Sequence, residues 1–85
     1  MRTHEWTVTI HLDEDVDTTH ARAVLHSTNG VTVHSSGTAR RNPGDAPIPE
    51  IGEELAAARA LGHLAERLSD VAEKDIQNLT HPIDA

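Results

Sequence analysis

The amino-acid sequence of 85 residues predicts one α+β domain, in which a three-stranded antiparallel sheet precedes a long helix packed on one face and a short C-terminal helix. Three observations lead to this prediction. Residues 5–12 alternate between apolar and polar side chains, as a half-buried strand does. Asn29-Gly30, a strong signal for a hairpin turn, separates two further alternating segments. A proline-rich loop then leads into a segment with the apolar spacing of a helix.

The predicted strands cover residues 5–12, 18–27 and 31–40 and form a meander over residues 5–41. An acidic turn at residues 13–17 joins the first two. The second segment is ambiguous, because its Ala and Arg residues would equally suit a short helix, but its Thr-rich start and its length favour a strand. The face that the helix is expected to cover carries Trp6, Ile10, Leu25 and Val33.

The helical part is predicted for residues 50–80, after a loop at 42–49 that holds three of the four prolines. Proline is tolerated in the first helical turn, and glutamates there complement the helix dipole. A single apolar stripe is expected on the long helix: Ile51, Leu55, Ala58, Leu61, Gly62, Ala65 and Leu68.

We expect the long helix to end near Ser69-Asp70. A helix over residues 50–68 is about 30 Å long, which matches an eight-residue strand of about 27 Å. Asp70 followed by Glu73 resembles a capping box, so residues 71–80 are predicted to form the short second helix.

Composition predicts a homodimer. The chain has no Cys and a single aromatic residue, Trp6, so neither disulfides nor a large core can stabilise it. A three-stranded sheet also leaves two open edges. The residues expected at the dimer interface are Trp6, Ile76 and Leu79. The sequence contains no recognisable signal peptide and no apolar run of membrane-spanning length, so we expect a cytoplasmic protein with no membrane contact.

Charge is unevenly distributed along a chain whose net charge is −7. Residues 18–44 contain three Arg and no Asp or Glu, so the middle hairpin is a positive island in an acidic protein. We expect this island to contact RNA or another partner through Arg22, Arg40, Arg41, His26 and His34. The alternative is that the arginines pair with acids of a partner subunit. The acidic balance argues against general polyanion binding, and no DNA binding is expected.

No catalytic or cofactor motif is found in the sequence. It has no G-x-S-x-G elbow, no glycine-rich phosphate loop and no H-E-x-x-H pair. Seven histidines invite a metal-site interpretation, but no spacing fixes two of them as ligands. The expectation is a protein without enzymatic activity, metal or cofactor.

Several segments resemble a family of small actinobacterial proteins of unknown function. They are Glu5-Trp6-Thr7-Val8, Gly37-x-Ala39-Arg40-x-Asn42-Pro43, Pro49-x-Ile51-Gly52-Glu53-Glu54-Leu55-x-x-Ala58-Arg59-Ala60-Leu61, Asp75-Ile76 and Thr80-His81. The resemblance implies a fold similar to double-stranded-RNA-binding domains and to ribosome hibernation-promoting factors, a dimer, and an association with hypoxia or dormancy responses. No catalytic residue comes with it.

Two functional hypotheses follow from the residues and the resemblance. The first is a dimeric stress- or dormancy-linked protein that associates with the ribosome as a hibernation-type regulator. The alternative is a dimeric adaptor or structural protein that binds a protein partner and makes no RNA contact. The salt dependence of any RNA binding separates the two, because phosphate contacts weaken steeply as salt rises.

Overall fold

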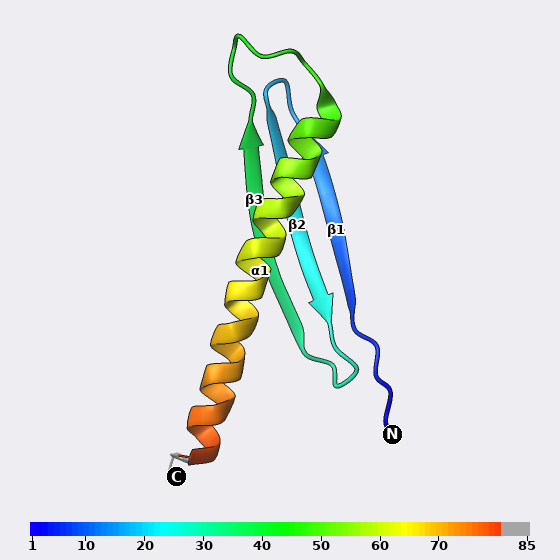
Figure 1. The fold of residues 1–85 in the computed structure, drawn as a ribbon, viewed down its shortest axis with the longest axis vertical. Helices are drawn as coiled ribbons and strands as arrows, with labels where there is room; N and C mark the ends of the chain where they lie inside the picture. The colour runs from blue at the N-terminus through cyan, green and yellow to red at the C-terminus, as the bar shows by residue number, and fades with distance from the viewer. Residues whose placement is uncertain (81–85) are drawn as a thin grey trace.

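The computed structural model describes residues 1–80 and contains three strands followed by one helix (Figure 1). The strands are β1 (Thr7–Glu14), β2 (Thr18–His26) and β3 (Thr32–Arg40), and the helix is α1 (Pro49–Thr80). The sheet is antiparallel in the order β1-β2-β3. The predicted α+β class and the sheet-then-helix order are therefore confirmed, and the strand limits agree with the prediction to within two residues.

Local signals explain both hairpins. Gly30, at φ 82°, occupies the left-handed conformation that the predicted Asn29-Gly30 turn requires. The Ser27 hydroxyl accepts hydrogen bonds from the backbone N–H groups of Asn29 and Val31 and closes this turn. In the acidic β1–β2 turn, the backbone N–H of Asp15 donates to the Thr18 carbonyl.

The helix covers β2 and β3 and barely touches β1 (Figure 1). The core between the layers consists of small and branched side chains, namely Ala21, Ala23, Leu25, Val33, Ala39, Ala56, Ala60 and Leu64. Trp6 precedes β1 and remains 52% exposed, so the expectation that one helix covers the whole apolar sheet face holds only for the part above β2 and β3.

Gly37 sets how closely the helix approaches β3. A Cβ at this position would lie against the backbone N of Ala60, 2.5 Å from the Ala56 carbonyl oxygen and 2.8 Å from the Arg59 Cβ. Only a residue without a side chain permits the helix backbone to lie this near to a strand. On the helix side, the small side chains of Ala56 and Ala60 permit the same close approach.

The predicted apolar stripe of α1 is therefore not the stripe that packs on the sheet. Ala56, Ala60 and Leu64 are buried, and Leu68 and Val71 pack against the core. Of the stripe predicted from the sequence, only Leu68 joins this contact; Ile51, Leu55, Ala58, Leu61, Gly62 and Ala65 are exposed. The close approach at Gly37 favours the alanine face over the face with larger side chains.

The predicted break near Ser69-Asp70 is also wrong, because α1 runs without interruption from Pro49 to Thr80. Val71 still packs against the core, so the sheet supports the helix past the expected cap. The 32 residues span about 48 Å, whereas a nine-residue strand spans about 30 Å. The helix thus extends well beyond the sheet (Figure 1). The residues after 80, where the predicted helical part ends, lie outside the described residues.

The outer edge of β3 is bonded to the helix. Arg59 Nη1 donates to the Thr38 carbonyl at 2.7 Å. His63 Nδ1 lies 2.7 Å from the Ser36 carbonyl oxygen and is the donor, because a carbonyl oxygen can only accept. From the strand side, the buried Ser35 hydroxyl donates to the Ala60 carbonyl at 2.6 Å. These bonds protect one sheet edge.

Candidate nucleic-acid interface

The sheet face turned away from α1 is polar and exposed. Alternation along the strands places on it the side chains that do not join the core. Its basic or potentially basic residues come from all three strands and are all exposed: His11, His20, Arg22, His26, His34 and Arg40. Among them, His20 Nδ1 lies 3.3 Å from the Thr38 hydroxyl. This face can offer donors to an anionic ligand.

A groove of about 500 Å³ runs beside β3 and joins this face to the helix. It is lined by Arg22, His34, Ser35, Ser36, His63, Glu66 and Arg67. Arg22 reaches it from β2, where its register partner is Ser36. Two guanidinium groups and two imidazoles thus line one hollow, with Glu66 as the single acid. Such a set of donors suits an anionic group such as a phosphate or a carboxylate.

Two of the expected partner-binding residues, Arg22 and His34, meet in this groove. Arg40 and His26 do not, because they lie at opposite ends of the sheet: Arg40 pairs with Thr18 and His26 pairs with Thr32. Both are exposed on the open face.

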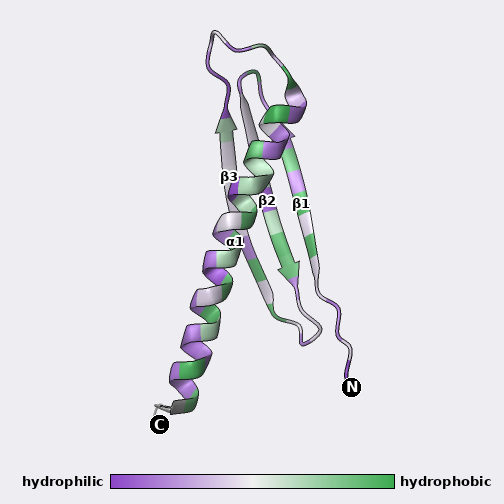
Figure 2. Ribbon diagram, viewed as in Figure 1, coloured by the Kyte–Doolittle hydropathy of each residue, from purple (hydrophilic) through white to green (hydrophobic). Residues whose placement is uncertain are grey.

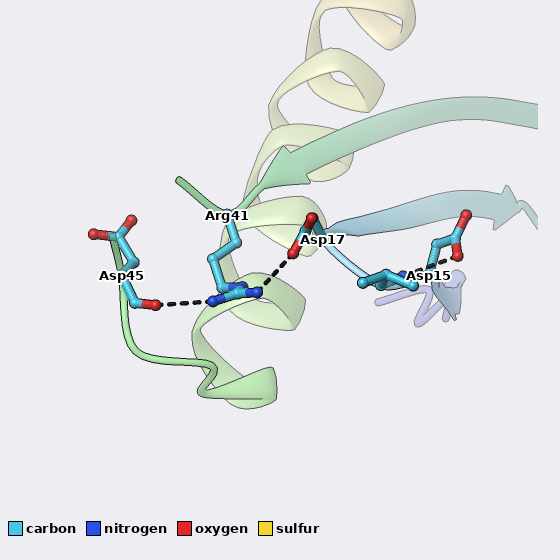
Figure 3. A network of polar contacts seen from close by, with 5 residues as sticks. Asp15, Asp17, Arg41 and Asp45 are labelled. Atoms are coloured by element: carbon cyan, nitrogen blue, oxygen red, sulfur yellow. Dashed lines mark hydrogen bonds and ion pairs between the residues drawn. The ribbon is translucent and has the colours of Figure 1, made fainter. Parts of the chain in front are cut away.

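Arg41 lies elsewhere and has partners within its own chain (Figure 3). Its Nη2 forms an ion pair with Asp17 Oδ1 at 2.7 Å, and its Nη1 donates to the Asp45 carbonyl at 2.9 Å. The side chains of the ion pair are 33% and 49% exposed. Arg41 therefore holds the 42–49 loop against the β1–β2 turn. An exposed pair contributes little stability, but these contacts occupy the guanidinium.

His63 and Arg67 are contributors to the groove that sequence reasoning missed. They lie four residues apart on one side of α1. That spacing is visible in the sequence, but it gains meaning only once the rotation of the helix about its axis is known.

A second hollow, of about 380 Å³, lies beneath the 42–49 loop and has the opposite character. Acidic and apolar side chains predominate in its lining, including Glu14, Asp15, Asp17, Ile48 and Leu55, and the arginines Arg40 and Arg41 also line it. Beside it, a hydrogen bond with the Glu14 carboxyl raises the pKa of Glu53, with desolvation and the charges of Glu14 and Glu50 acting in the same direction. Four acidic side chains and two arginines thus line this hollow, so acids outnumber bases there.

Residues 1–80 contain neither a metal-ligand cluster nor a membrane-spanning helix. No group of three or more His, Cys, Asp or Glu side chains in this part of the chain could hold a metal ion. No helix within it is long and apolar enough to cross a membrane.

Comparison with known proteins gives consistent matches across the chain. The family model described as Rv2632c-like matches residues 4–84. The uncharacterized protein Mb1767 of Mycobacterium bovis is 45% identical over 76 residues, which cover 89% of this chain and 80% of that protein. The uncharacterized protein Rv2632c of Mycobacterium tuberculosis is 41% identical over 70 residues, covering 82% and 74% respectively. The crystal structure of Rv2632c superposes with a TM-score of 0.75 at 38% identity, covering 98% of this chain and 95% of that one.

Proposed function

The chain belongs to the Rv2632c-like family, and we propose that it is a non-enzymatic, cytoplasmic homodimer that associates with the ribosome under stress or dormancy by binding RNA phosphates. The groove beside β3 makes the contact, with Arg22 and Arg67 as its cationic centre. Arg40, His26 and His34 extend the contact over the open sheet face.

The groove is the observation that carries this proposal. It gathers two guanidinium groups and two imidazoles in a protein whose net charge is −7. Guanidinium groups bind phosphate oxygens in a bidentate geometry that a lone lysine cannot supply. A local positive hollow in an acidic protein favours binding to one surface over general attachment to polyanions. The family resemblance implies a fold similar to double-stranded-RNA-binding domains and hibernation-promoting factors, and this implication supports the same partner.

Exposed apolar side chains support the homodimer. Trp6 is 52%, Ile76 60% and Leu79 83% exposed within the single chain. Ile76 and Leu79 lie three residues apart on α1 and are therefore neighbours on its surface, and adjacent exposed apolar side chains are typical of surfaces that associate.

Co-sedimentation with purified bacterial ribosomes, repeated with a short double-stranded RNA over a range of salt concentrations, tests the RNA contact. The variant Arg22→Glu/Arg67→Glu should lose binding, because it reverses both guanidinium charges of the groove. Wild-type affinity should fall by roughly one log unit per log unit of salt for each phosphate contacted. Arg41 is left unchanged because it pairs with Asp17.

The matched control is Arg2→Glu/Lys74→Glu, which reverses two exposed charges outside the groove. It alters the net charge as much as the groove variant does, so it should retain most of the binding. Equal losses in both variants would mean that net charge alone governs the association. A wild-type protein that binds neither ribosomes nor RNA at low salt would reject the proposal.

The alternative, a dimeric adaptor with a protein partner, is favoured by one observation: Arg41 is held by Asp17, which removes one cation from the positive island. An adaptor would show no salt-dependent RNA binding. Under this alternative, the exposed apolar surfaces bind a protein partner as well as the second subunit.

A further inference from the structure

The face of α1 opposite the sheet carries a second apolar stripe. Its positions recur at alternating intervals of four and three residues, without a break: Ile51, Leu55, Ala58, Gly62, Ala65, Ser69, Ala72, Ile76 and Leu79. This is the spacing by which two helices pack along a common seam, and it persists for roughly four heptads. These residues are called the outer seam below.

The outer seam faces away from the sheet. Each residue turns a helix by about 100°, which places Ala65 about 140° from Ala60 and about 100° from Leu64, two residues that pack on the sheet. Every outer-seam residue is classed as exposed, including Ile51 at 51% and Leu55 at 46%. Figure 2 shows apolar residues recurring along α1, which lies in front of the sheet in this view, down to the part beyond the sheet. A surface helix of a monomeric protein typically carries polar and charged residues on its solvent side.

We infer that the outer seam is a homodimer interface, in which α1 packs antiparallel against α1 of a second copy about a twofold axis near Ala65. The inference rests on the homodimer of the proposed function and gives it an interface. The two sheets then lie on the outside of a four-layer assembly, so that both grooves beside β3 remain open to RNA.

The order of residue sizes along the seam points to a second copy. Large side chains stand at both ends and small ones in the middle. Antiparallel pairing therefore sets Ile51 and Leu55 of one copy against Ile76 and Leu79 of the other. At the axis Ala65 meets Ala65, and beside it Gly62 meets Ser69, and these small residues allow the two backbones to approach closely. An unrelated partner would have no reason to match this symmetric order.

The helix dipole favours the antiparallel orientation. Antiparallel helices place opposite dipole ends together and separate the acidic first turns of the two copies.

Light scattering on the full chain tests the interface. At micromolar concentration the wild type should show twice the 9.2 kDa mass of one chain. Ala65→Glu sets two like charges against each other at the twofold axis and should give a monomer. Asn78→Glu changes the charge equally on the same helix but off the seam and should remain a dimer. Circular dichroism should show a folded chain for both, since both positions are exposed.

Cross-linking tests the orientation, and the absence of natural Cys makes each introduced thiol unique. Ala58→Cys alone should not cross-link with a short bis-maleimide, because antiparallel pairing holds the two thiols about 21 Å apart along the helix. A mixture of Ala58→Cys and Ala72→Cys chains should give the heterodimer. Cross-linking of Ala58→Cys with itself would show parallel helices and overturn the inference.

Trp6 reports whether a different surface forms the dimer. It lies outside the outer seam, so its fluorescence should not change when the dimer dissociates on dilution. If the Trp6 emission of the wild-type dimer shifts on dilution, the outer seam is not the interface, although the protein is still a homodimer. The same conclusion follows if the Ala65→Glu variant remains a dimer. A wild-type monomer overturns both the outer seam and the homodimer. Loss of RNA binding in the groove variant is independent of either result.

Discussion

The two long faces of α1 differ in what they pack against and in the size of their side chains. The sheet-facing side has Ala56, Ala60 and Leu64 and is buried. The outer side has larger residues at its ends, such as Ile51 and Leu55, and is exposed. The sheet-facing side also has Leu68 and Val71, so both sides are apolar and hydrophobicity alone does not decide which of them forms the core.

Shape decides between the two faces. Gly37 leaves room only for a helix whose facing residues are alanines, and the close contact lets Ser35, Arg59 and His63 form hydrogen bonds across the layers. Close packing over many atoms can outweigh the larger area that bulkier side chains would bury at a greater distance. Ile51 and Leu55 are then left exposed on the outer side.

Filling the space at Gly37 should have the largest effect on the monomer fold. In Gly37→Ala, the new Cβ would overlap backbone atoms of Ala56 and Ala60, which cannot rotate away as a flexible side chain can. We expect a loss of about 3 kcal/mol in the free energy of unfolding, measured by urea denaturation.

Gly44→Ala provides the control for that measurement, because nothing lies within 4 Å of a Cβ at Gly44. Its effect should stay within about 0.5 kcal/mol. If the two variants unfold at the same urea concentration, the helix does not lie on Gly37 as described, and the explanation for the alanine face fails.

The Ser35 hydroxyl should matter less than Gly37 but still measurably. Ser35→Ala removes the buried hydrogen bond to the Ala60 carbonyl and should cost about 1 kcal/mol. Ser36→Ala, on the exposed side of the same strand, makes the same chemical change and should cost almost nothing. Thermal unfolding of the two variants side by side gives the comparison, and equal melting temperatures would contradict it.

The sequence predicted the sheet well and the helix phase badly, for one physical reason. Strand alternation and the Asn29-Gly30 turn are local signals, so the strand limits came out within two residues. The helix instead offers two apolar stripes, and periodicity cannot say which of them meets the sheet. The answer depends on the contact between Gly37 and Ala60, which are 23 positions apart in the sequence.

The strand residues of the candidate site could be predicted from the sequence, and its helix residues could not. Arg22 and His34 follow from strand alternation, whereas His63 and Arg67 depend on the helix phase. The partner of Arg41 could not be foreseen either, because Asp17 reaches it only when the β1–β2 turn meets the end of β3. Residues that share an element are readily grouped from sequence; contacts between elements are not.

Gly62 tests whether a second helix covers the outer face of α1. In the monomeric Ala65→Glu chain, Gly62→Ala should stabilise the helix by about 0.5–1 kcal/mol, because glycine is the costlier residue in a helix interior and nothing lies within 4 Å of its added Cβ. In the wild-type dimer the gain should be smaller, since an added methyl group lies in the seam. Equal gains by urea denaturation in both backgrounds would argue that no second helix approaches Gly62.

The smallest expected effect is electrostatic and lies where α1 begins. The hydrogen bond with Glu14 raises the pKa of Glu53 above its ordinary value of 4.5. A raised pKa means that the folded chain holds this proton more tightly than the unfolded chain does. The resulting stability is fully present below pH 4.5 and is lost as pH rises through the raised pKa.

At pH 7 the carboxylates of Glu14 and Glu53 repel each other. The Glu53→Gln variant, whose amide can donate to Glu14, should therefore melt at a higher temperature than the wild type, and this difference should shrink towards pH 4. Glu54→Gln removes the same charge one residue along and gains no such bond, so it should show no advantage at pH 7. If both variants shift the melting temperature alike across this pH range, the effect belongs to the general charge of the helix start and not to the contact between Glu14 and Glu53.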